Sequence, residues 1–261
     1  MPKPATKSEP THSFRPVSFA TRHRTIGRSV GEVGTGKTRF WLTGPKPIFM
    51  QSLDKGLEGT VDQLFREGLI TSADDVQVAD YDWHPGSEDF SQDYAIELRE
   101  RLIADYHYAL DAGARTIVWD KEGDIWQLFR YAEFGGPSEA PKDYAQLNQR
   151  YIAIINKAKS YDVSLGLIQS FQDEWGQTGA ISRATGKKQF GKTGNRIAWG
   201  FDRLEELVFV NITHRREEGE FYLDVGKCRQ NTELQDQTIP GGTFAEFGTL
   251  LIPESDMEDW T

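Results

Sequence analysis

The chain contains 261 residues, of which 38% are hydrophobic and 12% aromatic, enough to bury one substantial core and to form one domain with appendages. No apolar run reaches the roughly 18 residues of a membrane span, and the first residues contain no apolar signal segment, so a cytoplasmic protein without membrane contact is expected. One cysteine, Cys228, excludes an internal disulfide framework and an all-cysteine metal site.

Charge is distributed unevenly along the chain. The formal net charge is −10, yet residues 1–30 contain six lysines and arginines and one glutamate, so the remaining residues carry a net charge of −15. An acidic body cannot coat duplex DNA through bulk charge. Any contact with nucleic acid therefore requires a local basic patch.

The two ends are expected to differ from the body, which spans residues 25–252. Residues 1–24 contain four prolines with scattered serine, threonine and lysine, and are expected to form a flexible basic tail. Residues 253–261 contain four carboxylates and Trp260. They are expected to form an exposed acidic tail, which either is simply solvated, or docks on a partner or competes with DNA for a basic groove.

The string GEVGTGKT at residues 31–38 is the most specific motif, because it fits the phosphate-binding pattern G-x-x-x-x-G-K-[ST]. In such a loop the backbone N–H groups surround phosphate oxygens, the lysine neutralises their charge and the following hydroxyl binds Mg²⁺. The alternative is a flexible glycine turn before a helix. The expected nucleotide-binding residues are Gly31, Gly34, Thr35, Gly36, Lys37, Thr38 and Arg39.

The segments on either side of this loop support the assignment unequally. A phosphate-binding loop follows a buried strand, but residues 24–30 supply only Ile26 and Val30 as large apolar side chains. After the loop, residues 37–44 are expected to start a helix whose apolar residues pack inward and whose positive N-terminal end lies at the phosphates.

Short apolar runs alternate with helical patterns through the rest of the body. Strands are expected at residues 47–54, 76–81, 114–120, 163–170, 204–215 and 219–229, the last two joined by a turn. Helices are expected at residues 56–69, 94–112, around 125–131 and at 144–161. This order predicts an α/β fold, with a mostly parallel central sheet flanked by helices on both faces and an antiparallel C-terminal extension.

Carboxylates at strand ends are the candidates for holding magnesium and activating water. Asp120 ends the apolar run TIVWD, 82 residues after Thr38, and would hold magnesium through water; a helix-capping aspartate is the alternative. Asp54, at the end of PIFMQSLD, is the first choice for activating water. Glu58 and Glu122 are its alternatives, because all three could border the same crevice at the strand ends.

Polar side chains on two later strands complete the candidate site. Gln169 could sense a γ-phosphate through its amide, with Gln172 as its rival; an ordinary polar strand end is the alternative for each. Lys227 and Arg229 are two residues apart in an expected strand, so their side chains point the same way. For this pair the alternative is two solvated cations on an outer strand.

Residues 176–198 reverse the acidic character of the body. The segment contains five glycines, Phe190 and no acidic residue. It cannot bury a core, but it can follow a phosphate backbone while Phe190 stacks on a base. The alternative is a surface insertion that binds nothing. The expected contacts to single-stranded DNA are Arg183, Lys187, Lys188, Phe190, Lys192 and Arg196.

The order of GEVGTGKT, PIFMQSLDKGLEG, TIVWD, SLGLIQS and VGKCRQN resembles the RecA-like P-loop ATPases. Among these it is most similar to the compact phage-encoded nucleotide-binding proteins of the single-strand annealing and recombination type. The resemblance spans about residues 25–250. It implies ATP and Mg²⁺ as cofactors and the cytoplasm of a host cell as the location.

The resemblance also implies roles for particular residues. Asp54 matches the catalytic carboxylate, which is a glutamate in most members, and Asp120 matches the magnesium-side aspartate. Lys227 and Arg229 would reach the γ-phosphate in a neighbouring subunit of a ring or filament, so full activity would require a homo-oligomer. The segment 176–198 takes the place of a mobile DNA-binding loop behind the sensor strand, so that the γ-phosphate state at the sensor could order or release it.

Together these observations predict a RecA-like ATPase, stimulated by single-stranded DNA, that assists phage-type recombination, annealing or replication and works with a single-strand-binding or replication protein. A P-loop kinase, with residues 176–198 as a lid over a small acceptor, is one alternative. A non-catalytic module whose assembly depends on nucleotide is the other.

Overall fold

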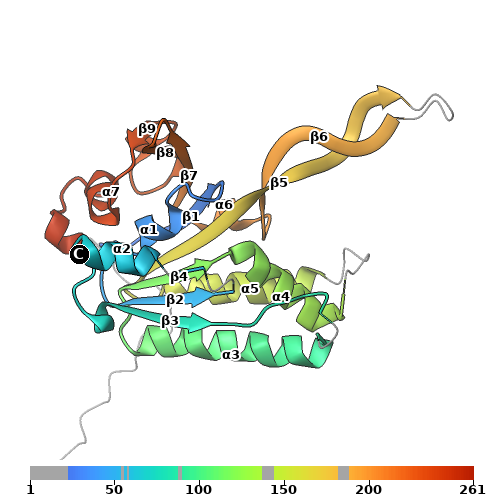
Figure 1. The fold of residues 1–261 in the computed structure, drawn as a ribbon, viewed down its shortest axis with the longest axis horizontal. Coiled ribbons are helices and arrows are strands. Elements are labelled where there is room, and N and C mark those ends of the chain that lie inside the picture. The colour runs from blue at the N-terminus through green and yellow to red at the C-terminus, as the bar shows by residue number, and fades with distance from the viewer. Residues whose placement is uncertain (1–22, 54–55, 58, 88–89, 137–143, 182–187) are drawn as a thin grey trace, which may run out of the picture.

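The computed structural model describes residues 23–53, 56–57, 59–87, 90–136, 144–181 and 188–261. The tail up to residue 22, the carboxylates Asp54 and Glu58, and the basic residues Arg183 and Lys187 lie outside the described residues. The described chain forms an α/β fold in which helices flank both faces of a mixed central sheet (Figure 1). The α/β architecture expected from the sequence is therefore confirmed.

The element bounds follow the apolar runs of the sequence closely. The strands are β1 (Ile26–Gly31), β2 (Ile48–Ser52), β3 (Val76–Asp80), β4 (Thr116–Asp120), β5 (Ser164–Ile181), β6 (Lys188–Trp199), β7 (Val210–Glu217), β8 (Glu220–Cys228) and β9 (Thr238–Pro240). The α-helices are α1 (Lys37–Trp41), α2 (Thr60–Arg66), α3 (Gln92–Asp111), α4 (Glu122–Phe134), α5 (Tyr144–Ala158), α6 (Leu204–Leu207) and α7 (Phe244–Leu251).

The sheet has the strand order β3-β2-β4-β5-β1-β7-β8-β9, and β6 pairs with β5 off this path. All pairs from β3 to β7 are parallel. The β7–β8 and β8–β9 pairs are antiparallel, which confirms the expected C-terminal extension. Because the parallel strands all run toward one edge, the residues that follow β1 and β4 meet there with the part of β5 just after Gln169.

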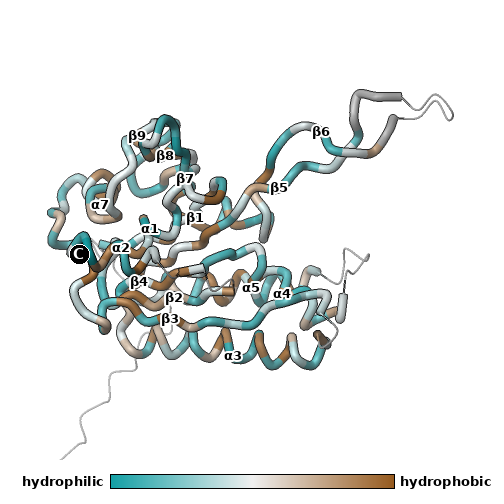
Figure 2. Tube along the Cα trace, in the orientation of Figure 1, coloured by the Kyte–Doolittle hydropathy of each residue, from teal (hydrophilic) through white to brown (hydrophobic). Residues whose placement is uncertain are grey.

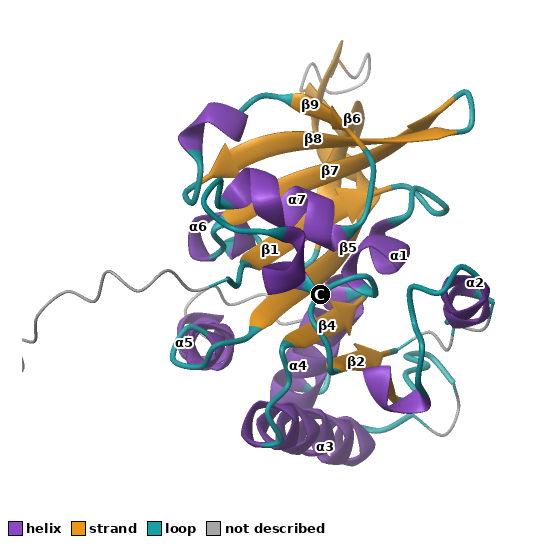
Figure 3. Cartoon of the chain, turned by 90° about the vertical axis from the view of Figure 1, so that its left-hand side faces the viewer, coloured by secondary structure: helices purple, strands orange, loops and turns teal. Residues whose placement is uncertain are grey.

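Two hydrophobic cores cover the two faces of the sheet. One core contains α3, α4 and α5, and the other contains α1, α2 and α7 (Figure 3). We call the second face the α1 face. In Figure 2 the central strands are largely brown, as expected for parallel strands that are buried on both faces.

The polar residues of β1, unexpected in a buried strand, have partners on both faces. On the α1 face, the Ser29 hydroxyl accepts a hydrogen bond from Trp41 Nε1 at 2.8 Å and lies 2.9 Å from Nε2 of His214. On the other face, Arg28 Nε donates to Gln169 Oε1 at 2.7 Å. Buried polar groups with partners are tolerated, so β1 forms despite its composition.

Two glycines allow α1 to approach the sheet closely. Gly27 and Gly166 are paired in register, and a Cβ at Gly166 would lie 2.4 Å from the Trp41 ring. A Cβ at Gly27 would lie 2.9 Å from the same ring. The Trp41 indole therefore occupies the space of two missing side chains and fixes α1, and with it the preceding loop, against β1.

Three expectations require correction. Residues 176–198, expected to form a loop, are mostly the paired strands β5 and β6, and residues 204–207, expected in a strand, form α6. The acidic end at residues 253–261 is not an exposed tail, because Trp260 is fully buried against Phe244 in the core on the α1 face.

A search of the described helices found none that combines the length and the apolar character needed to cross a bilayer.

Candidate nucleotide site

The backbone of the loop between β1 and α1 is constrained by its glycines. Gly34 and Gly36 adopt φ values of +80° and +84°, which side-chain-bearing residues rarely adopt. A Cβ at Gly31 would lie 2.6 Å from the His214 carbonyl oxygen and 2.7 Å from Thr35 Oγ1. Three of the motif glycines are therefore required by geometry, and turns of this kind aim successive N–H groups at an anion.

Lys37 lies across this loop and is 8% exposed. Its Nζ donates to the carbonyl oxygens of Gly31 and Glu32, each at 2.7 Å. Burial lowers the pKa of Lys37, and the charges of Asp120 and Glu32 oppose that shift. The ammonium group is thus held at the loop and interacts electrostatically with the Asp120 carboxylate at the end of β4.

The helix that follows the loop contributes less than expected. It ends at Trp41 and spans five residues, so its dipole is small and the loop amides and Lys37 must supply most of the anion binding. Thr38 lies in its first turn and is half-buried. Arg39 is ion-paired with Glu67 of the loop after α2 at 2.6 Å.

Asp120 lies on the α1 face, as a magnesium-side carboxylate requires. Val118 pairs with Gly166, on which Trp41 packs, and side chains alternate along a strand, so Asp120 shares this face. Asp120 is 7% exposed and pairs in register with Ser52 at the end of β2. Asp54 and Glu58 follow that end and lie outside the described residues.

Glu122 does not face the loop. It is fully buried on the opposite face, where its carboxylate accepts hydrogen bonds from the Tyr151 hydroxyl at 2.7 Å and from Gln169 Nε2 at 2.6 Å. Burial raises the pKa of Glu122 to about 7, although these hydrogen bonds act in the other direction. Its partners make Glu122 part of a structural network and not a group that activates water beside the loop.

Gln169, the first candidate for a γ-phosphate sensor, belongs to the same network and does not face the loop. Gln169 alternates with Gly166 and Ile168, so it points away from the α1 face, toward Arg28 and Glu122. The rival, Gln172, lines a cavity beneath α4. Ser170, the residue after Gln169, is half-buried and pairs with Trp199 of β6.

His214 is a site residue that the sequence analysis did not select. It ends the buried part of β7, and its ring contacts Phe40 edge-on, with the ring centres 5.3 Å apart. Burial, reinforced by the charge of Lys37, lowers the pKa of His214 to about 3. A neutral imidazole therefore packs beside the loop, with Nε2 hydrogen-bonded to the Ser29 hydroxyl.

Two cavities border the loop. One, of about 570 Å³, lies between Glu32–Thr35, Phe171 and the end of β7 from Thr213 to Glu217. The other, of about 310 Å³, lies beside Gly36 and Arg39 and extends to Phe221 and Gly241–Thr243. The loop is thus bordered by a cavity on each side.

The basic segment is an arm that projects from the body (Figure 1). Trp175 and Phe190 are 60% and 73% exposed on it. Of the expected DNA contacts with described side chains, Lys192 is ion-paired with Asp173, and Arg196 is ion-paired with Glu32 of the loop at 2.9 Å. These pairs are solvent-exposed and therefore weak, so a phosphate can compete for both cations. The side chain of Lys188 lies outside the described part.

Lys227 and Arg229 point the same way, as expected. Their side chains donate to consecutive carbonyl oxygens of α6, Lys227 to Glu205 and Arg229 to Glu206. Cys228 pairs with Val210, which in turn pairs with Gly27 near the start of β1. The two cations therefore lie at the amino edge of the parallel strands, away from the loop of their own chain.

The protein groups around the loop fit magnesium bound to a nucleotide. No cluster of three or more His, Cys, Asp or Glu side chains that could hold a metal exists among the residues described. Magnesium at phosphates takes most of its ligands from phosphate and water and needs only one or two protein oxygens. The Thr38 hydroxyl and the Asp120 carboxylate supply such oxygens.

Comparison with protein-family models and with curated proteins gave no match. The assignment of the site therefore depends on its own residues and geometry.

Proposed function

We propose that this protein is a RecA-like P-loop ATPase that binds single-stranded DNA and assists recombination, annealing or replication of the phage type. One observation carries the proposal: Lys37 lies folded onto a glycine-constrained loop and interacts with the strand-end carboxylate Asp120 on the same face of the sheet. A glycine turn without function does not require a buried lysine at that place.

ATP would bind with its phosphates at Gly34–Thr38 and its remaining parts in the bordering cavities. Magnesium would take the Thr38 hydroxyl, with Asp120 acting through water, and would supply charge neutralisation of the phosphates. Asp54 remains the proposed group that orients the attacking water, because it follows β2 at the edge where Asp120 lies.

Lys227 and Arg229 are proposed to act on the site of a neighbouring subunit. They lie at the amino edge of the strands, so they cannot serve the loop of their own chain. Charge supplied from a second subunit would make turnover depend on a ring or filament.

The arm gives the proposed link between nucleotide and DNA. Arg196 of β6 bonds to Glu32 in the phosphate loop, and its guanidinium lies 5.9 Å from the centre of the Phe171 ring at the arm base. A phosphate group that draws Arg196 away from Glu32 would alter the charge at the loop. DNA on the arm and ATP on the loop would then influence one another through this pair.

An ATPase assay with and without single-stranded DNA, run at several protein concentrations, tests the proposal. We expect phosphate release that DNA stimulates and that rises more than in proportion to protein concentration. Transfer to a small acceptor without DNA would instead identify a kinase, and binding without turnover an assembly module. Either result would refute the ATPase assignment.

Removal of arm charges should weaken DNA binding and its dependence on salt. With Lys187, Lys188 and Lys192 replaced by alanine, the slope of log affinity against log salt should fall by about 0.7 for each DNA phosphate that the arm no longer neutralises. A variant with Arg66, Arg101 and Lys157 replaced by alanine loses the same charge elsewhere and serves as the control. An unchanged slope in the arm variant would show that the arm is not the contact surface.

A further inference from the structure

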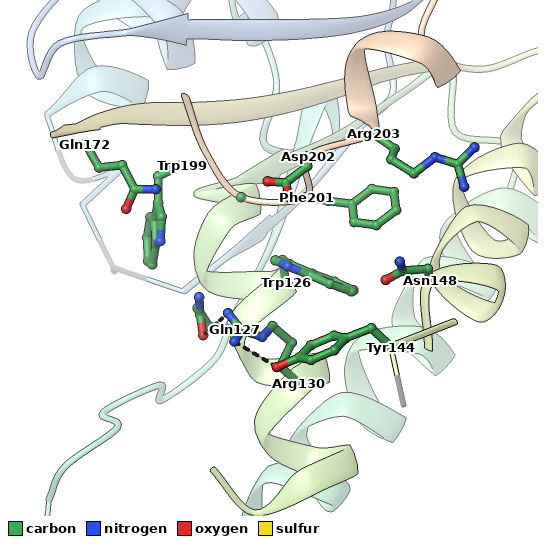
Figure 4. A pocket seen from close by; sticks show the side chains of 11 residues that line it. Trp126, Gln127, Arg130, Tyr144, Asn148, Gln172, Trp199, Phe201, Asp202 and Arg203 are labelled. Atoms are coloured by element: carbon green, nitrogen blue, oxygen red, sulfur yellow. Dashed lines mark hydrogen bonds between the residues drawn. The ribbon is translucent and has the colours of Figure 1, made fainter. Parts of the chain in front are cut away.

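A cavity of about 680 Å³ lies beneath the base of the arm, on the face opposite α1 (Figure 4). Its walls come from α4, α5, the first residues of the arm and the turn after β6. None of the residues assigned to ATP lines it. The cavity is therefore separate from the proposed ATP site.

Aromatic rings form much of the wall. Trp126 and Phe201 are nearly fully buried, with ring centres 4.8 Å apart, and Tyr151 packs against both. Trp199 is half-buried and stands across from them in Figure 4. A flat ring entering between Trp199 and the Trp126–Phe201 pair would stack on an aromatic face.

Two buried polar atoms at this cavity have no hydrogen-bond partner among the described residues: Arg130 Nε and Asn148 Oδ1. The other guanidinium nitrogens of Arg130 are held by Gln127 and by the Tyr144 hydroxyl at 3.0 Å. Burying a donor or acceptor without a partner costs about 1–3 kcal/mol. A ligand that reaches these two atoms would offer them the complementary acceptor and donor.

From these walls and atoms we propose that the cavity receives a nucleobase of the single strand that follows the arm. A base has two stacking faces and an edge with adjacent donors and acceptors, which matches the aromatic walls, Arg130 Nε and Asn148 Oδ1. The inference rests on the proposed function and adds a binding site for a base to the phosphate contacts of the arm.

The base of the arm borders the cavity. Ser170 pairs with Trp199 and Gln172 with Ile197, so Gln172, Ile197 and Trp199 share one face of the hairpin. Phe171 and Arg196 lie on the other face of the hairpin. Phe171 lines the cavity beside the loop, and Arg196 is ion-paired with Glu32 of the loop. A strand held by Arg196 crosses the edge of the hairpin to reach the cavity mouth at Gln172 and Trp199.

The cavity also adjoins the end of β4. A Cβ at Gly123 would lie 2.6 Å from the Trp199 ring. The ring therefore packs directly on the first turn of α4, three residues after Asp120. The Phe201 N–H lies 3.4 Å from a Glu122 carboxylate oxygen, to which it donates. A base that moves Trp199 would therefore shift the segment that carries the magnesium-side carboxylate.

Fluorescence anisotropy with a labelled thymidine oligonucleotide and with its abasic counterpart tests the inference. Trp199→Ala should weaken binding of the normal oligonucleotide between about 5- and 100-fold, the loss of one base–aromatic stack, and Asn148→Leu about 5-fold. Binding of the abasic strand should change in neither variant, and the salt slope should stay at the wild-type value. Tyr108→Ala, which removes a 63% exposed ring on α3, is the control.

The outcomes separate the cavity from the arm. Equal loss on both oligonucleotides would mean that the variants disturb the arm and would overturn the base site, as would wild-type affinity in Asn148→Leu and Trp199→Ala alike. In that case DNA binding itself would survive. A wild-type protein that binds no oligonucleotide would overturn both proposals. If thymidine monophosphate binds with the same sensitivity to Asn148→Leu but does not compete with the oligonucleotide, the ligand is a free nucleotide and the strand assignment fails.

Discussion

Replacement of Lys37 by alanine is expected to lower the affinity for ATP between about 10- and 100-fold, the loss expected when a charge-assisted contact to phosphate is removed. The Lys37 ammonium is held at the loop by the carbonyl oxygens of Gly31 and Glu32, so little side-chain entropy is lost when it contacts the phosphates. Equilibrium binding of a fluorescent ATP analogue measures the loss.

The fold of this variant should remain intact. Phe40 and Trp41, which anchor α1 in the core, are unchanged, and the ammonium is buried at some desolvation cost. We therefore expect a thermal midpoint close to that of the wild type. Lys46→Ala removes a lysine nearby that is ion-paired with Asp75 outside the loop, and it should bind ATP normally. Wild-type affinity in Lys37→Ala would refute the nucleotide site.

The parts of the fold that sequence patterns predicted are those with dense apolar content. The runs at β2, β4 and the first half of β5 are continuous and hydrophobic, and the apolar face of α3 repeats with helical spacing. Here burial alone selects the structure. The C-terminal end escaped prediction because Trp260 is a single aromatic among carboxylates, and only its contact with Phe244 shows that it belongs to the core.

The arm was mistaken for a loop for a related reason. Its sequence is polar and rich in glycine, so neither alternation nor propensity indicates a strand, and the pairing between β5 and β6 supplies what composition does not. In the candidate site, the motif glycines fall where the backbone has a positive φ or a close approach, because the motif specifies backbone geometry, and nucleotide binding there stays a prediction. The facing of Gln169 depends on strand register and that of Glu122 on how α4 starts after β4, and no local pattern of the sequence contains either.

The neutral state of His214 makes stability depend on pH in a defined direction. The pKa of His214 is lowered from 6.5 to about 3 in the fold. Between these two pH values the unfolded chain binds a proton at His214 that the folded chain does not bind. This contribution is fully present above pH 6.5 and is lost as pH falls toward 3. Its slope approaches about 1.4 kcal/mol for each pH unit.

Glu122 opposes this slope over part of the range. Its pKa is raised from 4.5 to about 7, so its contribution is fully present below pH 4.5 and is lost as pH rises through 7. Between pH 4.5 and 6.5 the two effects have opposite sign and nearly equal slope. The wild-type free energy of unfolding should thus change little in that window, where the lowered pKa of His107 adds a rise with pH, and should fall below it, where carboxylates such as Asp75, with a pKa of about 2, add to the loss.

Replacement of His214 by glutamine should expose the contribution of Glu122. Glutamine offers both a donor and an acceptor to the Ser29 hydroxyl and cannot titrate, so the free energy of unfolding should decrease as pH rises from 4.5 to 7, by up to about 3 kcal/mol. Denaturant titrations at intervals across this range measure the slope. His84→Gln, at a side chain that is 73% exposed, should keep the flat wild-type profile. If His214→Gln keeps it as well, then His214 is not neutral in the fold, and the support that it gives the phosphate loop must be of another kind.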